Sequence, residues 1–309
     1  MKLWLVTAAL SLVLVVVLGG CNRGNDAPDG GTARERAVTA IVDNVIAPSY
    51  QAVDVSSAAL SQAVADLCAA PSIDTIAGAR TATGAAWSAW EHTETFDVGP
   101  AVARRSNTYV AYRVAPGRVD VLLNGTPPAD ADAARNRTAS NQRGYGAIDH
   151  LLAADDPAQY PGARCVYLTA LTDLVAEESA ALADAWAGEG REEVLAMNAS
   201  DVIDDLINMQ VSFLEATVRT YDDGTDPTRS EALEIPGALV GMADVYTAGL
   251  DGLLTNALAR TVHEEINAAL ARSVADAAPA IEALRATIAT EVVSALDVTV
   301  GFSENDGDS

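Results

Sequence analysis

Two short clusters of polar residues carry the side chains that could do chemistry in this sequence. The first contains Trp90, Glu91 and His92, and the second ends in Asp149 and His150. Carboxylates and imidazoles are ligands that iron and zinc accept in proteins. Adjacent helical residues point about 100° apart, so Asp149 and His150 cannot easily hold one ion together. On spacing alone, the favoured interpretation is an aspartate and a histidine on the surface of a helix end.

The third histidine, His263, lies in a segment that nearly matches a zinc-peptidase helix. Such a helix needs His-Glu-x-x-His, so that two imidazoles share one face. Here Asn267 occupies the second histidine position, and we interpret the segment as a solvated helix face. The sequence contains no Gly-rich phosphate loop, no Gly-x-Ser-x-Gly elbow and no Cys-x-x-Cys pair. It therefore gives no support for serine or cysteine nucleophile chemistry.

Helices must position these clusters, because apolar residues recur mostly three and four apart along the body of the chain. We therefore expect an all-α fold. Thr32 and Glu35 form a capping box that begins the first helix, and Pro48 should kink or break that helix. Residues 96–143 hold many turn signals and are expected to be irregular. A second helix is predicted to end at Pro71. Further helices are predicted over 73–95, over a short stretch from about 144, and over 163–187, 191–221, 237–255, 257–276 and 279–296.

Two helical bundles are expected, because long helical hairpins begin again after residue 160. The N-terminal bundle would cover residues 32–160 and contain the helix that begins near Gly144. The C-terminal bundle would cover residues 161–309. Binding sites in bundles form between facing helices, so the polar clusters are candidates for such a site.

The N-terminus predicts export and attachment of a lipid to Cys21. Lys2 precedes an apolar run that ends in small residues, which is typical of a signal peptide over residues 1–20. The run is rather short for a membrane-spanning helix, although an uncleaved anchor is the alternative. Residues 18–21 match a bacterial lipobox. We expect the protein on the outer face of a bacterial membrane, in the periplasm or at the cell surface, with residues 21–31 as a flexible tether.

The net charge of the mature chain is strongly negative. Loss of Lys2 with the signal peptide leaves 18 basic and 43 acidic residues, a formal charge of −25. Such a surface repels nucleic acid, so a nucleic-acid partner is excluded. Solubility or a salty habitat is the simpler explanation of the acidity.

Cys68 and Cys165 remain once Cys21 is assigned to the lipid. Two cysteines in an exported protein suggest one disulfide, and two separate buried thiols are the alternative. The bridge would close a loop of about a hundred residues.

Several blocks, in their order and spacing, resemble the imelysin family, also called the M75 peptidase family, from about residue 36 to residue 308. The family implies an all-α fold of two bundles, a periplasmic or surface location and an association with iron acquisition. The blocks are residues 42–50, Trp90-Glu91 with Gly99-Pro100, residues 116–120, residues 164–168 and residues 298–308.

The family's hallmark is Gly-x-His-x-x-Glu, which aligns with residues 144–149. Gly144 is kept, Gly146 replaces the histidine and Asp149 replaces the glutamate. A metallopeptidase needs a metal with an open position, so loss of the imidazole makes hydrolysis unexpected. Asp149 remains a candidate ligand, joined by Glu91 if the two helices pack side by side, or by His150 if the helix is rotated.

The lipobox, the family blocks and the altered motif together lead us to expect a protein that binds iron, or else zinc or copper, for an iron permease or another uptake component and without turnover. One alternative is a metallopeptidase with a rearranged site. Another is a non-catalytic partner module of a membrane transport complex. Arg118 and Asp120 either line the site or form a salt bridge that fixes the turn before it, and we favour the structural role.

Overall fold

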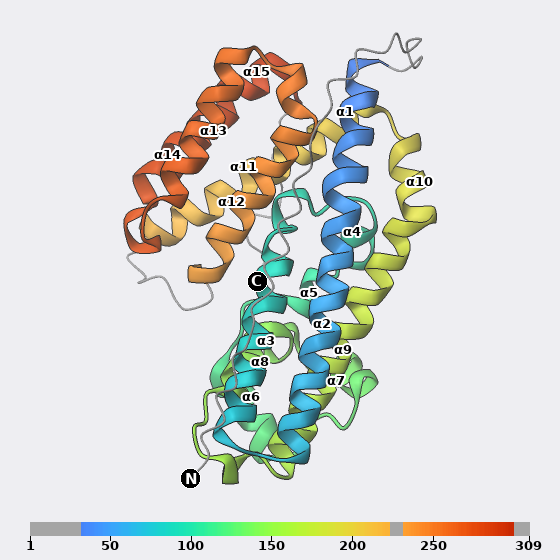
Figure 1. Ribbon diagram of the computed structural model, residues 1–309, viewed down its shortest axis with the longest axis vertical. Coiled ribbons are helices and arrows are strands. Elements are labelled where there is room, and N and C mark those ends of the chain that lie inside the picture. The colour runs from blue at the N-terminus through green and yellow to red at the C-terminus, as the bar shows by residue number, and fades with distance from the viewer. Residues whose placement is uncertain (1–31, 223–230, 300–309) are drawn as a thin grey trace, which may run out of the picture. The chain divides into compact units, whose positions relative to one another are not determined.

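The computed structural model describes residues 32–222 and 231–299 (Figure 1). In these two ranges the regular structure is entirely helical and no strand is present, which confirms the all-α prediction. None of the helices in the described ranges is long and apolar enough to cross a membrane. The predicted signal peptide, the lipid site at Cys21 and the tether lie outside the described residues.

The elements follow one another along the chain as regular α-helices joined by short 3-10 and π segments. They are α1 (Ala33–Ile41), η1 (Val42–Ile46), α2 (Ala47–Ala69), α3 (Ile73–Glu91), η2 (Glu94–Phe96), α4 (Pro100–Arg104), α5 (Asn107–Val110), α6 (Pro116–Asn124), α7 (Ala131–Arg137), η3 (Ser140–Gln142), α8 (Gly144–Leu152), η4 (Pro157–Gln159), α9 (Ala163–Ala187), α10 (Glu189–Ala196), α11 (Ala199–Asp222), α12 (Glu231–Ala248), η5 (Leu250–Leu253), α13 (Asn256–Leu270), η6 (Val274–Asp276), α14 (Ala278–Thr287), η7 (Ile288–Val292) and α15 (Val293–Leu296).

The first helix begins at the predicted capping box but does not end at Pro48. Thr32 Oγ1 accepts a hydrogen bond from the Glu35 backbone, and the Glu35 side chain bonds back to Thr32. The chain then stays helical from Ala33 to Ala69, with Pro48 in the first turn of α2. The π segment η1 directly precedes that turn. A change of hydrogen-bond register there accommodates a proline that has no N–H to donate.

Two groups of helices form the core (Figure 1). In the first, α2 packs against α3 and α9, and α8 packs against α3 and α9. In the second, α14 packs against α11 and α13, and α12 packs against α13. Helix α9 follows the predicted boundary at residue 160 but belongs to the first group. The division into two separate domains stays a prediction.

The groups meet where α12 packs against α3 and where η2 contacts both α11 and α12. This junction places the end of the Trp90-Glu91 helix beside the C-terminal half of the chain.

Two predicted segments differ from the structure. Residues 96–143 are not simply irregular, because they contain the short helices α4 to α7. The helix predicted over 191–221 is divided into α10 and α11. Asn198 Oδ1 accepts a hydrogen bond from the Ser200 N–H at 2.9 Å, and this helix cap begins α11.

A disulfide joins Cys68, near the end of α2, to Cys165, in the first turns of α9. The predicted pairing is therefore confirmed. The two cysteines are 97 residues apart in sequence.

Candidate functional site

The motif helix α8 packs closely against Val114 at the position where Gly146 replaces the family's histidine. A Cβ atom on Gly146 would lie 3.0 Å from Val114 Cβ, which is tighter than ordinary van der Waals contact. Gly144 has φ +77°, and a Cβ there would collide with the Val110 carbonyl oxygen. Position 144 thus needs glycine for its backbone, while a side chain at 146 would require Val114 to shift by a few tenths of an ångström.

Glu91 is the last residue of α3, which packs against α8, and its carboxylate bonds to an aromatic side chain. Its side chain is 1% exposed, and Oε1 accepts a hydrogen bond from Trp87 Nε1 at 2.5 Å. The Trp87 ring stacks on Tyr145 with 6.0 Å between ring centres. Burial, and to a lesser degree the Glu91 charge, raises the pKa of Tyr145, so this phenol stays protonated. Glu91 thus takes part in the core packing between α3 and α8.

His150 and Asp120 pair with each other at the protein surface. His150 Nε2 lies 2.8 Å from Asp120 Oδ1, and the two side chains are 28% and 51% exposed. The Arg118–Asp120 salt bridge that we favoured from the sequence is absent from the ion pairs of the described residues, where Asp120 pairs with His150. Helical residues two apart do not face each other. Asp120 therefore pairs with His150 of α8 and not with Arg118.

These positions do not assemble the metal ligands that the sequence suggested. Across residues 32–222 and 231–299, no three side chains of the His, Cys, Asp and Glu types are grouped as a metal site requires. Asp149, Glu91 and His150 therefore do not form a ligand set. The motif helix therefore does not present the three protein ligands that a resident zinc site uses.

Ser49, His92 and Asp244 have the residue types of a hydrolase triad but not its proton arrangement. Ser49 Oγ lies 3.2 Å from His92 Nδ1, and His92 Nε2 lies 2.9 Å from Asp244 Oδ2. The Ser49 hydroxyl already donates to the Val45 carbonyl at 2.7 Å. A nucleophilic serine must give that proton to its histidine. The trio instead ties α2, α3 and α12 together.

A cleft that sequence reasoning missed lies where η2 meets α11. It consists of two adjoining cavities of about 240 and 580 Å³, which share Asp97, Met209 and Ser212 in their lining. We call these two cavities the Asp97 cleft. Its acidic lining residues are Glu94, Asp97 and Asp205, and none of the described residues that line it is basic.

Among the described residues, the neutral Tyr50 hydroxyl is the hydrogen-bond partner of the Asp97 carboxylate. Tyr50 OH donates to Asp97 Oδ1 at 3.5 Å, and no arginine or histidine of the described residues pairs with this carboxylate. Burial raises the pKa of Asp97 to about 6, although the hydrogen bond from Tyr50 opposes this shift. Tyr50 is fully buried and stacks on Trp186, with 5.9 Å between ring centres. The carboxylate is thus held against aromatic packing with its charge uncompensated.

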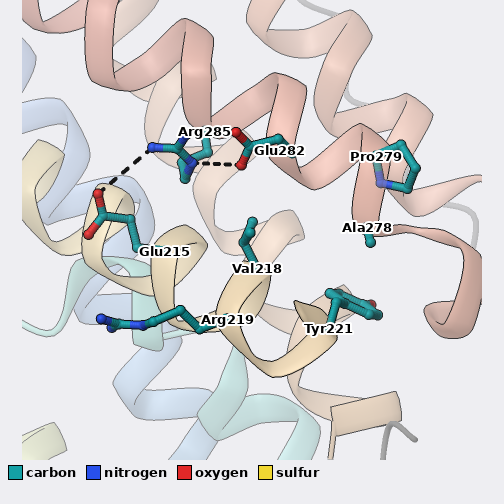
Figure 2. Close-up of a pocket in the computed structure, with 8 residues that line it drawn as sticks. All are labelled: Glu215, Val218, Arg219, Tyr221, Ala278, Pro279, Glu282 and Arg285. Carbon is teal, nitrogen blue, oxygen red and sulfur yellow. Dashed lines mark hydrogen bonds and ion pairs between the residues drawn. The ribbon is translucent and has the colours of Figure 1, made fainter. Parts of the chain in front are cut away.

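The hollow between α11 and α14 shows the opposite electrostatic arrangement (Figure 2). Its volume is about 630 Å³. Arg285 donates to both Glu282 carboxylate oxygens at 2.7 Å and lies 3.8 Å from Glu215. Because its acidic and basic groups neutralise one another, this hollow offers less attraction to a charged ligand than the Asp97 cleft.

Comparison with known proteins identifies the family. Residues 46–306 match the family described as imelysin, peptidase M75, and the chain therefore belongs to the imelysin family. An imelysin-like protein from Psychrobacter arcticum 273-4 has a similar structure, with a TM-score of 0.73 and 17% identity, over 87% of this chain and 97% of that one. A protein of Parabacteroides distasonis ATCC 8503, named as an iron-regulated protein A precursor, has a TM-score of 0.63 and 16% identity, over 88% and 96%. No curated protein matches the chain.

Replacement of Asp97 by asparagine is expected to stabilise the protein at neutral pH. The folded pKa near 6 lies above the usual 3.8, so folding favours the protonated form and Asp97 costs stability as the pH rises from 4 to 6. Asparagine removes this cost, which is about 3 kcal/mol at pH 7 and about 0.5 kcal/mol at pH 4. Urea unfolding across this range measures the difference, with Asp184→Asn on the exposed side of α9 as the control. A difference that does not grow with pH would contradict the assignment.

Proposed function

We propose that this protein is an exported, lipid-anchored binding protein that captures a cation in the Asp97 cleft for uptake and does not chemically change it. The observation that supports the proposal is the Asp97 carboxylate, held against Tyr50 and paired with no cationic side chain of the described residues. Proteins accept such a cost to stability chiefly where function needs it. A bound cation would neutralise this charge.

The proposed location depends on the N-terminal sequence. A lipid on Cys21 would hold the domain on the outer face of a bacterial membrane, in the periplasm or at the cell surface. Labelling cells with a radioactive fatty acid tests the anchor, because the label should enter the native chain but not Cys21→Ser. Equal labelling of the two proteins would contradict it.

The proposed role in uptake comes from relatives. One solved structure of the same fold is named as an iron-regulated protein A precursor. We propose that this chain delivers its ligand to an iron permease or to another uptake component. Neither the motif helix nor the Asp97 cleft groups three metal-ligating side chains of the described residues, so the cleft is preferred as the capture site for its buried Asp97 carboxylate alone.

Absence of turnover is proposed because both routes to hydrolysis lack a required part. A metal-bound water would need ligands that Gly146 and Asp149 do not provide. A serine nucleophile would have to pass its proton to His92, but the Ser49 hydroxyl donates its hydrogen bond to the Val45 carbonyl. The metallopeptidase alternative therefore has no feature of the described residues in its favour.

Titration of the mature chain, carrying Cys21→Ser, with ferrous, ferric, zinc, copper and hexylammonium ions tests this function by calorimetry. Any cation that binds should lose at least about tenfold in affinity in Asp97→Ala, since a charge-assisted contact is removed. The same cation should bind Asp149→Ala as it binds the parent chain. Unfolded protein substrates should stay intact with or without a chelator.

Three outcomes would count against the proposal. Metal affinity lost in Asp149→Ala but kept in Asp97→Ala would move the site to the motif helix. Chelator-sensitive cleavage that Asp149→Ala abolishes would establish a metallopeptidase. If no cation binds, the protein is better explained as a partner module of a transport complex.

A further inference from the structure

The larger cavity of the Asp97 cleft has apolar walls from which a metal ion would gain nothing. Val98, Val194 and Val202 are buried in these walls, whereas Val102 and Met197 are 53% and 46% exposed. Single exposed apolar residues are common on proteins, but these two line the same cavity. Its volume of about 580 Å³ suits a small organic molecule. A ligand that is stabilised by contact with these apolar walls must carry a hydrocarbon group.

The polar end of the cleft suits one positive charge better than a metal ion. Asp97 is a single carboxylate beside the Tyr50 hydroxyl, and no three metal-ligating side chains are grouped in the described parts of the chain. Transition metals and calcium bind through several ligands, whereas one carboxylate neutralises one ammonium group and accepts its hydrogen bonds. Trp90 also lines the smaller cavity, and the faces of indole rings attract ammonium ions.

We propose that the ligand of the Asp97 cleft is an organic ammonium cation with an apolar body. The ammonium group binds Asp97, and the hydrocarbon lies along Val102 and Met197. Glu94 and Asp205 attract the cation to the opening. This inference rests on the proposed function and specifies the chemical class of the captured cation.

A chain-length series of amines tests the inference on the mature chain carrying Cys21→Ser. Calorimetric titration with ethyl-, butyl- and hexylammonium should give an affinity that rises about three- to fourfold for each added methylene. Hexanol has the same body without the charge and should bind at least about tenfold more weakly. Hexanoate, which carries the opposite charge, should show no binding.

Variants locate the site. Asp97→Asn removes only the charge and should weaken hexylammonium binding at least about tenfold. Met197→Ser removes part of the apolar wall and should weaken binding several-fold and flatten the dependence on chain length. Val121, on α6, is 71% exposed and does not line the cleft, so Val121→Ser is the matched control. Circular dichroism checks that each variant folds, and the comparison of ligands on the parent chain does not depend on any variant.

The outcomes separate this inference from the proposed function. Binding of hexanol or hexanoate as tight as that of hexylammonium would overturn the inference, and so would affinities that do not change with chain length. Metal ions that bind in an Asp97-dependent way while alkylammonium ions do not would overturn the inference and leave the proposed function standing. If no cation binds through Asp97, both are rejected.

Discussion

Replacement of Glu178 by alanine is expected to lower the free energy of unfolding by about 3 kcal/mol. Glu178 lies in α9 with its side chain 1% exposed, and four hydrogen bonds satisfy its carboxylate. Arg104 donates two of them at 2.9 Å each, Ser106 donates one at 2.7 Å and Arg135 donates one at 3.2 Å. Removal of the carboxylate leaves the two arginines without their shared partner. Because both arginines are partly exposed and water can reach them, the cost falls at the lower end of values for buried pairs.

Urea unfolding of Glu178→Ala and of Glu177→Ala measures this cost against a matched control. Glu177 is the neighbouring residue, 55% exposed, and its carboxylate lies 3.2 Å from Arg135. Loss of this surface pair should cost no more than about 1 kcal/mol. Equal losses in the two variants would show that burial of Glu178 contributes nothing.

The contribution of Glu178 should also depend on pH. Burial tends to raise its pKa, but hydrogen bonds from Arg104 and Ser106 outweigh burial and hold the pKa below the usual 4.5. The folded state therefore binds the Glu178 proton less readily than the unfolded state does. Its stabilisation is present above pH 4.5 and is lost as the pH falls through the lowered folded value.

The Glu178 cluster also positions one wall of the Asp97 cleft. Arg104 ends α4, and Ser106 follows the C-cap residue of that helix, Arg105. Their hydrogen bonds fix this segment against α9, and the segment carries Val102 and Ala103 into the cleft. Glu178→Ala should therefore weaken ligand binding as well as folding.

The helical core could be predicted from the sequence because its signals are local. Apolar spacing of three and four residues indicates helices without any knowledge of their partners. The capping box at Thr32 and Glu35 is equally local, and both of its hydrogen bonds form as expected. The division between α10 and α11 was missed because a single asparagine cap, Asn198, sets it within a continuous apolar pattern.

The candidate site was only partly predictable, because its features depend on distant residues. The missing imidazole at Gly146 is visible in the sequence, and so is the presence of Trp90 and Glu91 on one helix. Asp97 gave no such signal, since it lies among turn residues and its burial depends on Tyr50, 47 positions away, and on α11. A carboxylate in a turn is ordinarily solvated, and only tertiary packing makes this one costly.

Removal of the disulfide between Cys68 and Cys165 is expected to lower the free energy of unfolding by about 2–5 kcal/mol. The bridge closes a loop with ends 97 residues apart, and its main effect is to restrict the unfolded chain. Urea unfolding of Cys68→Ser/Cys165→Ser should show a lower midpoint, and dithiothreitol should lower the midpoint of the parent protein in the same way. Dithiothreitol should not affect the double variant. An unchanged midpoint in that variant would contradict the expectation.

The disulfide should affect stability without affecting the cleft, and this distinguishes it from Glu178. Cys68 lies 18 residues after Tyr50 along α2, about 27 Å at the rise of an α-helix. No residue of the bridge lines the Asp97 cleft. In the absence of urea, at a temperature where the double variant is folded, its affinity for hexylammonium should match that of the parent chain. Glu178→Ala should bind hexylammonium more weakly under the same conditions. If both variants lose affinity equally, the loss reflects lower global stability, and Glu178 has no separate role in positioning the cleft wall.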